Sequence, residues 1–575
     1  MISSKYISKI TIILISAVLA LCLLAMGLSD RWLSAVSHTG YAMEYEDALF
    51  DTSKVLEIDI MIDEAEWNDM LENATQEEYH ECDVVINGTT FYQVGIRTKG
   101  NTSLSAIAMD PDNNRYSFKL EFDQYVDGQT CFGLDKLVLN NNYADTTNMK
   151  EAIVYDMFQY LDTDASLYNY ANISVNNEYW GVYLALEAVE ESFMLRNYGT
   201  EKGYLYKPDS MNFGKNDGDQ KPAGGFPTPP EGGFQMPEDV GEPGQNQQTP
   251  PGFEEESGAA TGNTGASQSG DAAQSAAGQD DKRSSGRERF SGGGRPGGDS
   301  AGQGGFPGGM GGGSNLNYSD DNLDSYTDIW DGQVNDSTDA DHKRVVEALK
   351  NIYERTDIEK YIDVDQILKY MAVHNFSVNE DSLSGGMAHN YYLYEANGQI
   401  SILPWDYNLS FGGMNGGDGT SVANEPIDDS WQATQLFDFI LEDEEYKARY
   451  HEYYNRLVDE YLYGGGFEET YNRIRSQIDS LVETDPNAMY SYEEYDNGAN
   501  ILYELVMLRA ESIKGQLDGT IPSTSEGQKA DTSSLVDASH INLSDLGQFM
   551  GGGFGGGFDG ENRQTPGNEQ PAAAE

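Results

Sequence analysis

Residues 390–408, NYYLYEANGQISILPWDYN, decide the fold because they predict a two-stranded ribbon. The ribbon connects a region whose apolar residues have the spacing of strands with a region whose apolar residues have the spacing of helices. Short apolar and aromatic runs lie on either side of a turn at residues 395–398, which is the pattern of a hairpin. Pro404 then turns the chain away from the second strand, and Asp406 follows almost at once. A carboxylate at the end of a strand can reach a ligand while its backbone stays fixed.

Upstream of the ribbon, residues 53–207 read mainly as strands. Apolar and polar residues alternate, or form short apolar runs, in five segments: VLEIDIMI, CDVVING, FYQVGIRTKG, YSFKLEF and KLVLNN. One segment, TTNMKEAIVYDMFQYL, has helical spacing instead, and Asp145 just before it is a suitable helix cap. This region therefore predicts a mostly antiparallel sheet with one inserted helix.

Helical periodicity dominates around and after the ribbon, from about residue 325 to 520. The helical segments include DADHKRVVEALKNIYERT, DVDQILKYMAVHNF, EEYKARYHEYYNRLVDEYL and ILYELVMLRAESIKGQL. A sheet-rich half followed by a helix-rich half predicts an α+β, bilobal layout. We therefore expect a sheet-rich N-lobe over residues 31–207, a helical C-lobe over residues 325–520, and a nucleotide cleft between them.

Two further segments are too rich in Gly, Pro and Ser to bury a core. Residues 208–324 and 521–575 are predicted to be a disordered insert and a disordered Gly-rich tail. The whole chain has 35 Lys and Arg against 96 Asp and Glu, a formal net charge of −61. A surface this acidic repels phosphate backbones, which argues against nucleic acid as a partner, and a bound nucleotide would need locally placed cations.

The N-terminal segment, residues 1–30, predicts a membrane anchor. Residues 10–28 carry no charge and can span a hydrocarbon core of about 30 Å. Lys5 and Lys9 precede this run and favour a cytoplasmic N-terminus. We therefore expect a single-pass protein of a bacterial cell membrane whose remaining chain faces outside. The alternative is a cleaved signal peptide, which would make the protein secreted.

The cysteine content excludes a cysteine-built zinc site. Three cysteines occur, and Cys22 lies in the apolar N-terminal run. Cys82 and Cys131 are then the one pair left for a disulfide. So few cysteines are typical of a bacterial surface protein that does not rely on disulfides.

Three polar residues around the ribbon form a minimal set for phosphoryl transfer. Asp381 follows an apolar helix, Asn390 opens the ribbon, and Asp406 leaves it. The reaction needs an aspartate for the acceptor hydroxyl and hard oxygen ligands for a metal ion, here an asparagine and a later aspartate. The alternative for either aspartate alone is an ordinary turn residue, because Asp is common in turns.

The sheet half offers complementary parts. Residues 95–103, GIRTKGNTS, predict a strand that runs into a small polar loop, whose amides and basic groups could cradle phosphates. Lys119 lies opposite the apolar face of its strand, and Glu151 in the following helix is its candidate partner. The alternatives are an exposed strand lysine and a solvated helix glutamate.

Several blocks of the sequence resemble the CotH family of atypical secreted kinases. They are KLVLNNNYADTTNMKEAIVYDMFQYL, NEYWGVYLALEAVEESF, YLYK and ISILPWDYNLSFGG, in the family's order. RTKGNTS resembles the family's R-x-R-G-N-S-S-like loop, with Lys99 in place of the second arginine. DVDQILKYMAVHNFSVNEDS resembles the helix that leads to its catalytic aspartate. The resemblance covers most of residues 53–207 and 325–520.

This resemblance implies a protein-kinase-like fold and a transferase that uses ATP and Mg²⁺ or Mn²⁺ to phosphorylate Ser or Thr of surface, coat or secreted proteins. Asp381 would be the catalytic residue, and Asn390 and Asp406 would be the metal ligands. The nucleotide side would be formed by the Lys119–Glu151 ion pair and by the loop residues Arg97, Lys99, Asn101 and Ser103.

Two departures keep other functions open. Asp381 and Asn390 are farther apart than in ordinary kinases, and Asn408 stands where many relatives have a second acid. An inactive pseudokinase that serves as a surface scaffold is therefore one alternative. A surface adhesin is another, but it does not explain why the three polar residues gather around one ribbon. The sequence favours the active kinase.

Overall fold

The computed structural model describes residues 40–200, 202–208, 312–385, 388–414, 416–431, 433–547 and 549. The predicted membrane anchor, residues 1–30, lies outside these residues, as do most of the predicted insert and the end of the predicted tail. Among the helices of the described residues, none has the length and apolar character needed to cross a membrane.

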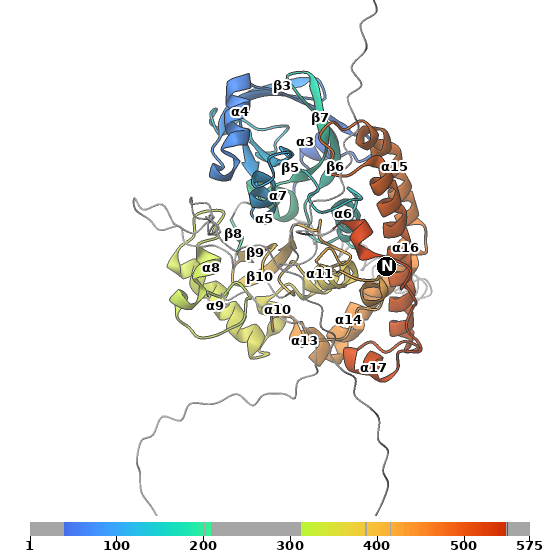
Figure 1. The fold of residues 1–575 in the computed structure, drawn as a ribbon. Coiled ribbons are helices and arrows are strands. Elements are labelled where there is room, and N and C mark those ends of the chain that lie inside the picture. Colours follow the sequence, from blue (N-terminus) through green and yellow to red (C-terminus); the bar gives the residue numbers. More distant parts are fainter. Residues whose placement is uncertain are drawn as a thin grey trace, which may run out of the picture. The chain divides into compact units, whose positions relative to one another are not determined.

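Seven strands of the sheet-rich half close into a barrel, in the order β1-β2-β3-β4-β5-β7-β6 (Figure 1). Neighbouring strands are antiparallel except β1 and β6, whose parallel pairing closes the barrel. The strands are β1 (Leu56–Met61), β2 (His80–Ile86), β3 (Thr89–Lys99), β4 (Ser117–Glu121), β5 (Lys136–Asn140), β6 (Tyr168–Val175) and β7 (Glu178–Glu187). The five strands that alternation predicts are confirmed, and so is the inserted helix.

Apolar and polar side chains alternate along strands such as β3 and β4, so this part of the barrel wall has an apolar inner face and a polar outer face. Inward residues such as Ile96 on β3 and Phe118 on β4 are fully buried in a core that fills the barrel. The outward side chains of the same two strands are polar, and Arg97 pairs in register with Lys119. Because the side-chain period of a strand is two, the basic residues of β3 and β4 share one outer surface.

The predicted bilobal, protein-kinase-like fold is wrong. The strands of the first half form the closed barrel, and not the sheet of a separate lobe. Part of its outer wall is buried with the helical half in a second, larger core, to which β5 contributes Val138, β7 Leu184 and β6 Tyr168. The cause is the β1–β6 pairing, which joins residues such as Ile58 and Ile173 that are distant in sequence.

The predicted ribbon is confirmed and belongs to a second, three-stranded sheet. Strands β9 (Tyr391–Ala396) and β10 (Gln399–Pro404) are antiparallel, and β8 (Tyr204–Tyr206) adds to the free edge of β9. The order is β10-β9-β8. Residues on both sides of the predicted insert thus meet in one sheet.

Helices cover the barrel and the ribbon (Figure 1). Those of the first half are α3 (Glu44–Leu49), α4 (Glu64–Glu72), η1 (Ala74–Gln76), α5 (Thr102–Ala108), α6 (Lys150–Tyr160) and α7 (Glu191–Tyr198). Around the ribbon follow η2 (Leu323–Tyr326), α8 (Thr327–Trp330), α9 (Asp339–Tyr353), α10 (Ile358–Tyr361), α11 (Val364–Ser377) and α12 (Thr420–Ala423). The last are α13 (Asp438–Glu442), α14 (Glu444–Asn455), η3 (Arg456–Leu462), α15 (Gly466–Glu483), α16 (Tyr492–Asp518), α17 (Ser525–Ala530) and η4 (Leu543–Leu546).

The folded chain is longer than composition predicts at two boundaries. The insert was expected to end at residue 324, but the described chain resumes at residue 312, and Leu316 is already buried in the larger core. The tail was expected to begin at residue 521, yet Ile541 and Leu543 are also buried there. Both segments are polar overall, and a few well-spaced apolar residues suffice to anchor them.

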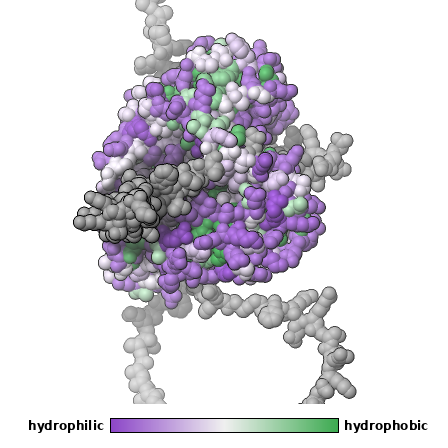
Figure 2. All heavy atoms as spheres, turned by 180° about the vertical axis from the view of Figure 1, so that it is seen from behind, coloured by the Kyte–Doolittle hydropathy of each residue, from purple (hydrophilic) through white to green (hydrophobic). Residues whose placement is uncertain are grey.

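The surface is mostly hydrophilic. Figure 2 shows one face on which apolar areas are small and scattered. This agrees with the large excess of acidic residues. Inside the barrel, Cys82 and Cys131 are both buried and both free, so the one available disulfide is not formed.

One buried ion pair joins the barrel to the helical region. The guanidinium of Arg115, which precedes β4, donates to Asp485, which follows α15, at 2.6 Å. The two side chains are only 3% and 2% exposed. The Asp485 carboxylate also accepts the backbone N–H of Val182 on β7 at 3.1 Å. Removing one partner would leave the other charge buried without compensation.

We predict that Arg115→Met lowers the free energy of unfolding by about 3–5 kcal/mol, the cost of breaking a buried pair. The double variant Arg115→Met/Asp485→Asn should lose clearly less than the sum of the two single variants. Urea unfolding measures both. Lys54→Met, in an exposed pair with Asp51, is the control and should change the free energy by less than about 1 kcal/mol. Additive single effects would show that the two charges are not coupled.

Candidate functional site

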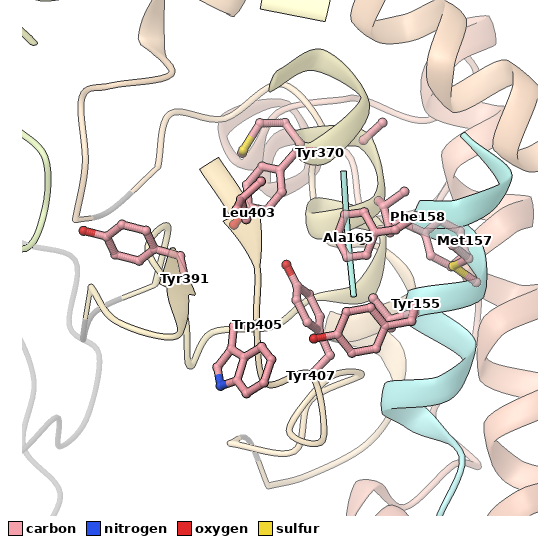
Figure 3. Packing of buried hydrophobic residues seen from close by; sticks show 14 of the residues in the cluster. Tyr155, Met157, Phe158, Ala165, Tyr370, Tyr391, Leu403, Trp405 and Tyr407 are labelled. Carbon is pink, nitrogen blue, oxygen red and sulfur yellow. The ribbon is translucent and has the colours of Figure 1, made fainter. Parts of the chain in front are cut away.

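Two buried aromatic residues fix the position of Asp406 at the end of the ribbon (Figure 3). Trp405 is 3% exposed, and Tyr407 is completely buried. The Tyr407 ring packs edge-on against Phe158 of α6, with ring centroids 5.3 Å apart, and against Tyr155 at 6.2 Å. Asp406 between them has a left-handed backbone, with φ of 62°. The flanking aromatics therefore determine where this carboxylate points.

Asp381 lies in the loop after α11 and is held from two sides. One carboxylate oxygen is 2.8 Å from His389 Nε2, and the other accepts the side-chain amide of Asn390 at 3.0 Å. The same amide also donates to the backbone carbonyl of Asp381 at 2.9 Å. The structure thus brings together the predicted catalytic aspartate and one of the two predicted metal ligands.

The Asp381 loop is tied to the backbone of Asp406 by Asn379. The Asn379 side chain accepts the N–H of Asp381 and donates to the carbonyl of Asp406, both at 3.2 Å. Strand pairing adds a second connection, because Tyr391 is opposite Pro404 at the end of the ribbon. Asn390 and Asp406 therefore leave the ribbon at the same end, as the sequence predicts.

A chain of hydrogen bonds links the barrel wall to the backbone of Tyr407, the residue after Asp406. Lys99, at the end of β3, donates to the side-chain oxygen of Asn140 on β5 at 2.8 Å. Asn140 in turn donates to the carboxylate of Glu151 at 2.8 Å. The other oxygen of Glu151 accepts the backbone N–H of Tyr407 at 3.3 Å. We call Lys99, Asn140, Glu151 and Asp406 the polar seam.

Burial dominates the electrostatics of the polar seam. It raises the pKa of the Glu151 carboxyl to about 7, with a further contribution from the negative charge of Asp406, while Asn140, Lys99 and the Tyr407 N–H oppose the rise. Burial lowers the pKa of the Lys99 ammonium, against the opposing effects of Asp406 and Glu151. Lys99 is joined to Glu151 through Asn140, a connection that the sequence did not predict.

The predicted ion pair between Lys119 and Glu151 is wrong. Lys119 donates instead to Glu190, just before α7, at 3.0 Å. Lys136 binds the other oxygen of the same carboxylate at 3.1 Å. The physical reason is register, because Lys119 lies beside Arg97, whereas Lys99 is opposite Ser117 at the end of the strand pair. Lys99 takes the position that was expected for Lys119.

The other members of the predicted phosphate loop lie around the start of α5. Arg97 donates to Glu77 and lies over the ring of Tyr79, so its guanidinium is already engaged. Asn101 is the residue before α5, and Ser103 lies in the first turn. The role of this loop in phosphate binding stays a prediction.

The sequence analysis missed several residues that support the site. His374 of α11 is buried, lies 3.0 Å from the Tyr407 hydroxyl and 3.1 Å from that of Ser382, and has its pKa lowered to about 3 by burial. Lys207 lies over the Trp405 ring at 5.4 Å, and Lys99 lies over the same ring at 5.6 Å. Asn140 and Lys207 lie in two of the blocks that resemble the family, KLVLNNNYADTTNMKEAIVYDMFQYL and YLYK, and Asn379 precedes Asp381 by two residues, but nothing in the sequence gave any of them a role.

The donor set suits a metal ion that arrives with phosphate. Among the described residues, no group of three His, Cys, Asp or Glu side chains could hold a metal ion alone. Mg²⁺ usually binds proteins through one or two carboxylates, with water and phosphate oxygens completing the shell. The Asp406 carboxylate and the side-chain oxygen of Asn390 are hard ligands of this kind. Asn408 is engaged elsewhere, since its amide donates to the Tyr143 carbonyl at 2.8 Å.

A cavity of about 550 Å³ lies elsewhere in the molecule. It is lined by residues of α16 and of the chain that follows, among them Leu508, Lys514 and Val536. None of the residues of the polar seam lines it, and neither does Asp381. The lining has charged residues of its own, Glu511, Lys514, Asp518 and Asp537, but none of the predicted site residues is among them.

We predict that Glu151→Gln changes how stability depends on pH. The folded protein raises the pKa of Glu151 from 4.5 to about 7, so it binds this proton more tightly than the unfolded chain does. This contribution to stability is complete below pH 4.5 and is lost as the pH rises to about 7. The wild type should therefore lose stability relative to the variant across that range. Thermal unfolding from pH 4.5 to 8 measures this, and parallel curves would contradict it.

Comparison with known proteins places this arrangement in a family. A family model described as CotH kinase protein matches residues 96–229 and 310–513, which together are more than half of the chain. The inner spore coat protein H of Bacillus subtilis (strain 168) is 23% identical over 169 residues, which are 28% of this chain and 44% of that protein. The matching part thus spans less than half of the curated relative. The chain belongs to the CotH kinase family.

Proposed function

We propose that the protein is a metal-dependent kinase that transfers the γ-phosphate of ATP to Ser or Thr of other proteins. The observation that carries the proposal is the polar seam, in which the half-buried Lys99 is joined through Asn140 to the buried Glu151. Asp406 lies at the end of the ribbon where Asn390 binds Asp381. A cation for phosphate, hard ligands for a metal and a carboxylate for the acceptor are the parts that phosphoryl transfer needs.

Each residue has a distinct proposed role. Lys99 neutralises phosphate oxygens and is oriented by Asn140 and Glu151. Asp406 and Asn390 hold Mg²⁺ or Mn²⁺, which supplies charge neutralisation of the transferring phosphate when bound. Asp381 orients the acceptor hydroxyl and accepts its proton as the hydroxyl oxygen bonds to the γ-phosphorus. The bond between that phosphorus and the β–γ bridging oxygen breaks, which leaves a phosphoester and ADP.

The family supports our proposal for the acceptors and the location. The curated relative is named for the inner spore coat, which supports a coat or cell-surface location and protein acceptors there. An outward-facing, membrane-anchored or secreted chain stays part of the proposal. The alternative is a pseudokinase scaffold, which the missing second acid at Asn408 favours. Against it, the Asn408 side chain is bound to the Tyr143 carbonyl and has a structural role.

We predict that Asp381→Asn lowers kcat by on the order of 100-fold or more, the usual contribution of a general base. Asp406→Asn should instead raise the Mg²⁺ or Mn²⁺ concentration required for half-maximal rate. Transfer from γ-labelled ATP to a Ser-rich acceptor, titrated with each metal, measures both effects. Asp331→Asn, an exposed aspartate after α8, is the control. Metal-dependent nucleotide binding without any transfer by the wild type would favour the pseudokinase.

We further predict that Lys99→Met weakens nucleotide binding about tenfold or more, because it removes a charged hydrogen-bond donor from the phosphates. Lys119→Met is the matched control, since Lys119 lies on the neighbouring strand but is held by Glu190. Its affinity for nucleotide should stay within about threefold of the wild type. Calorimetry with ATP and Mg²⁺ measures both variants. If Lys119→Met weakened nucleotide binding more than Lys99→Met, Lys119 would be the nucleotide-binding lysine instead.

A further inference from the structure

A segment at the end of the folded chain passes over the loops of the candidate site. We call residues 536–547 the strap. It follows α16 and α17 and lies beyond residue 513, where the family match ends. Its regular structure is limited to the single turn η4, so tertiary contacts must hold it in place.

The first part of the strap is fastened to the segment around α12. The Asn424 side chain makes two hydrogen bonds with the backbone of Val536, both at 2.9 Å. Gly419 donates its N–H to the Ile541 carbonyl at 2.9 Å, and Leu543 donates to the Gly417 carbonyl at 3.0 Å. These contacts set the direction in which the strap continues.

The second part of the strap packs directly on two loops of the site. Leu543 lies against Gly412, where an added Cβ would be 3.1 Å from a Leu543 methyl. The carbonyl of Leu546 accepts the N–H of Thr146 at 3.4 Å. Gly547 has φ of +90°, and a Cβ there would lie 2.4 Å from the Ala144 carbonyl oxygen. The strap thus touches the loop after β5 and the loop after Asp406.

These two loops adjoin three residues of the polar seam, Asn140, Glu151 and Asp406. Residues 141–149 connect Asn140 to Glu151, and residues 406–413 follow the ribbon. The loops also touch each other, since Asn408 donates to the Tyr143 carbonyl at 2.8 Å. Neither loop contains a helix or a strand, so each depends on such contacts for its position.

We propose that the strap is a positioning element of the site: it presses the loop after β5 and the loop after Asp406 together, so that Glu151 and Asp406 face Lys99, without touching substrate. The positioning claim stands on the contacts alone. Its consequence for catalysis rests on the proposed function.

The test is Gly547→Val in the full chain. The substitution forces a branched side chain into a left-handed backbone and against the Ala144 carbonyl. Amide hydrogen exchange should rise about tenfold or more in peptides that cover 140–149 and 406–413, while strands β2 and β3 stay protected and report an intact barrel. With transfer activity present, kcat should fall on the order of 10- to 100-fold with little change in the KM for acceptor.

Two control variants test whether the effects depend on the contacts of the strap with the two loops. Ser539→Ala changes an exposed strap residue whose hydroxyl bonds only to Asp537, and both readouts should match the wild type. A chain that ends after Phe549 should also match, because it keeps the strap. If amide exchange in both loops of Gly547→Val equals that of the wild type, the proposal is overturned. It is also overturned if amide exchange in the loops increases while kcat stays at the wild-type value. If the wild type transfers no phosphate, the proposed function fails and exchange alone decides the proposal about the strap.

Discussion

The arrangement of the molecule depends on one buried carboxylate, that of Glu151. Its two oxygens accept hydrogen bonds from Asn140 of the barrel and from the backbone of Tyr407 at the end of the ribbon. A buried carboxylate is costly unless its oxygens are satisfied, so this residue constrains barrel, helix α6 and ribbon at the same time. Lys99, which donates to Asn140 and lies over the Trp405 ring, is thereby connected to the end of the ribbon, and the proposed chemistry depends on that placement.

The larger core, which the barrel shares with the helices, also constrains how the two halves of the chain are arranged. Because the outer wall of β5, β6 and β7 is buried against the helices, the two halves cannot hinge as independent lobes without exposing apolar surface. The buried pair of Arg115 and Asp485 adds an electrostatic link between them beside β7.

Local patterns in the sequence predicted many of the strands and helices. They did not predict the pairing of strands that are distant in sequence. Alternation identified β1 to β5 and the ribbon, and the spacing around Glu151 identified α6. The parallel pairing of β1 with β6 has no local signal, so the barrel was not predicted. At the site, Asp381, Asn390 and Asp406 were proposed from their positions around the ribbon, and the structure brings Asn390 into contact with Asp381. Lys99 and Lys119 both point outward from neighbouring strands, and only the tertiary register decides which of them is connected to Glu151, here Lys99 through Asn140.

The two thiols inside the barrel have a consequence for how the chain matures. Burial raises the pKa of Cys82 to about 12 and raises that of Cys131 well above its usual range, so both stay protonated and unreactive. Neither joins in a disulfide. The barrel therefore needs no oxidant to reach its final covalent state, and its stability should be indifferent to the redox potential of its surroundings. A chain exported from a reducing cytoplasm would need no assistance from thiol oxidases on the far side.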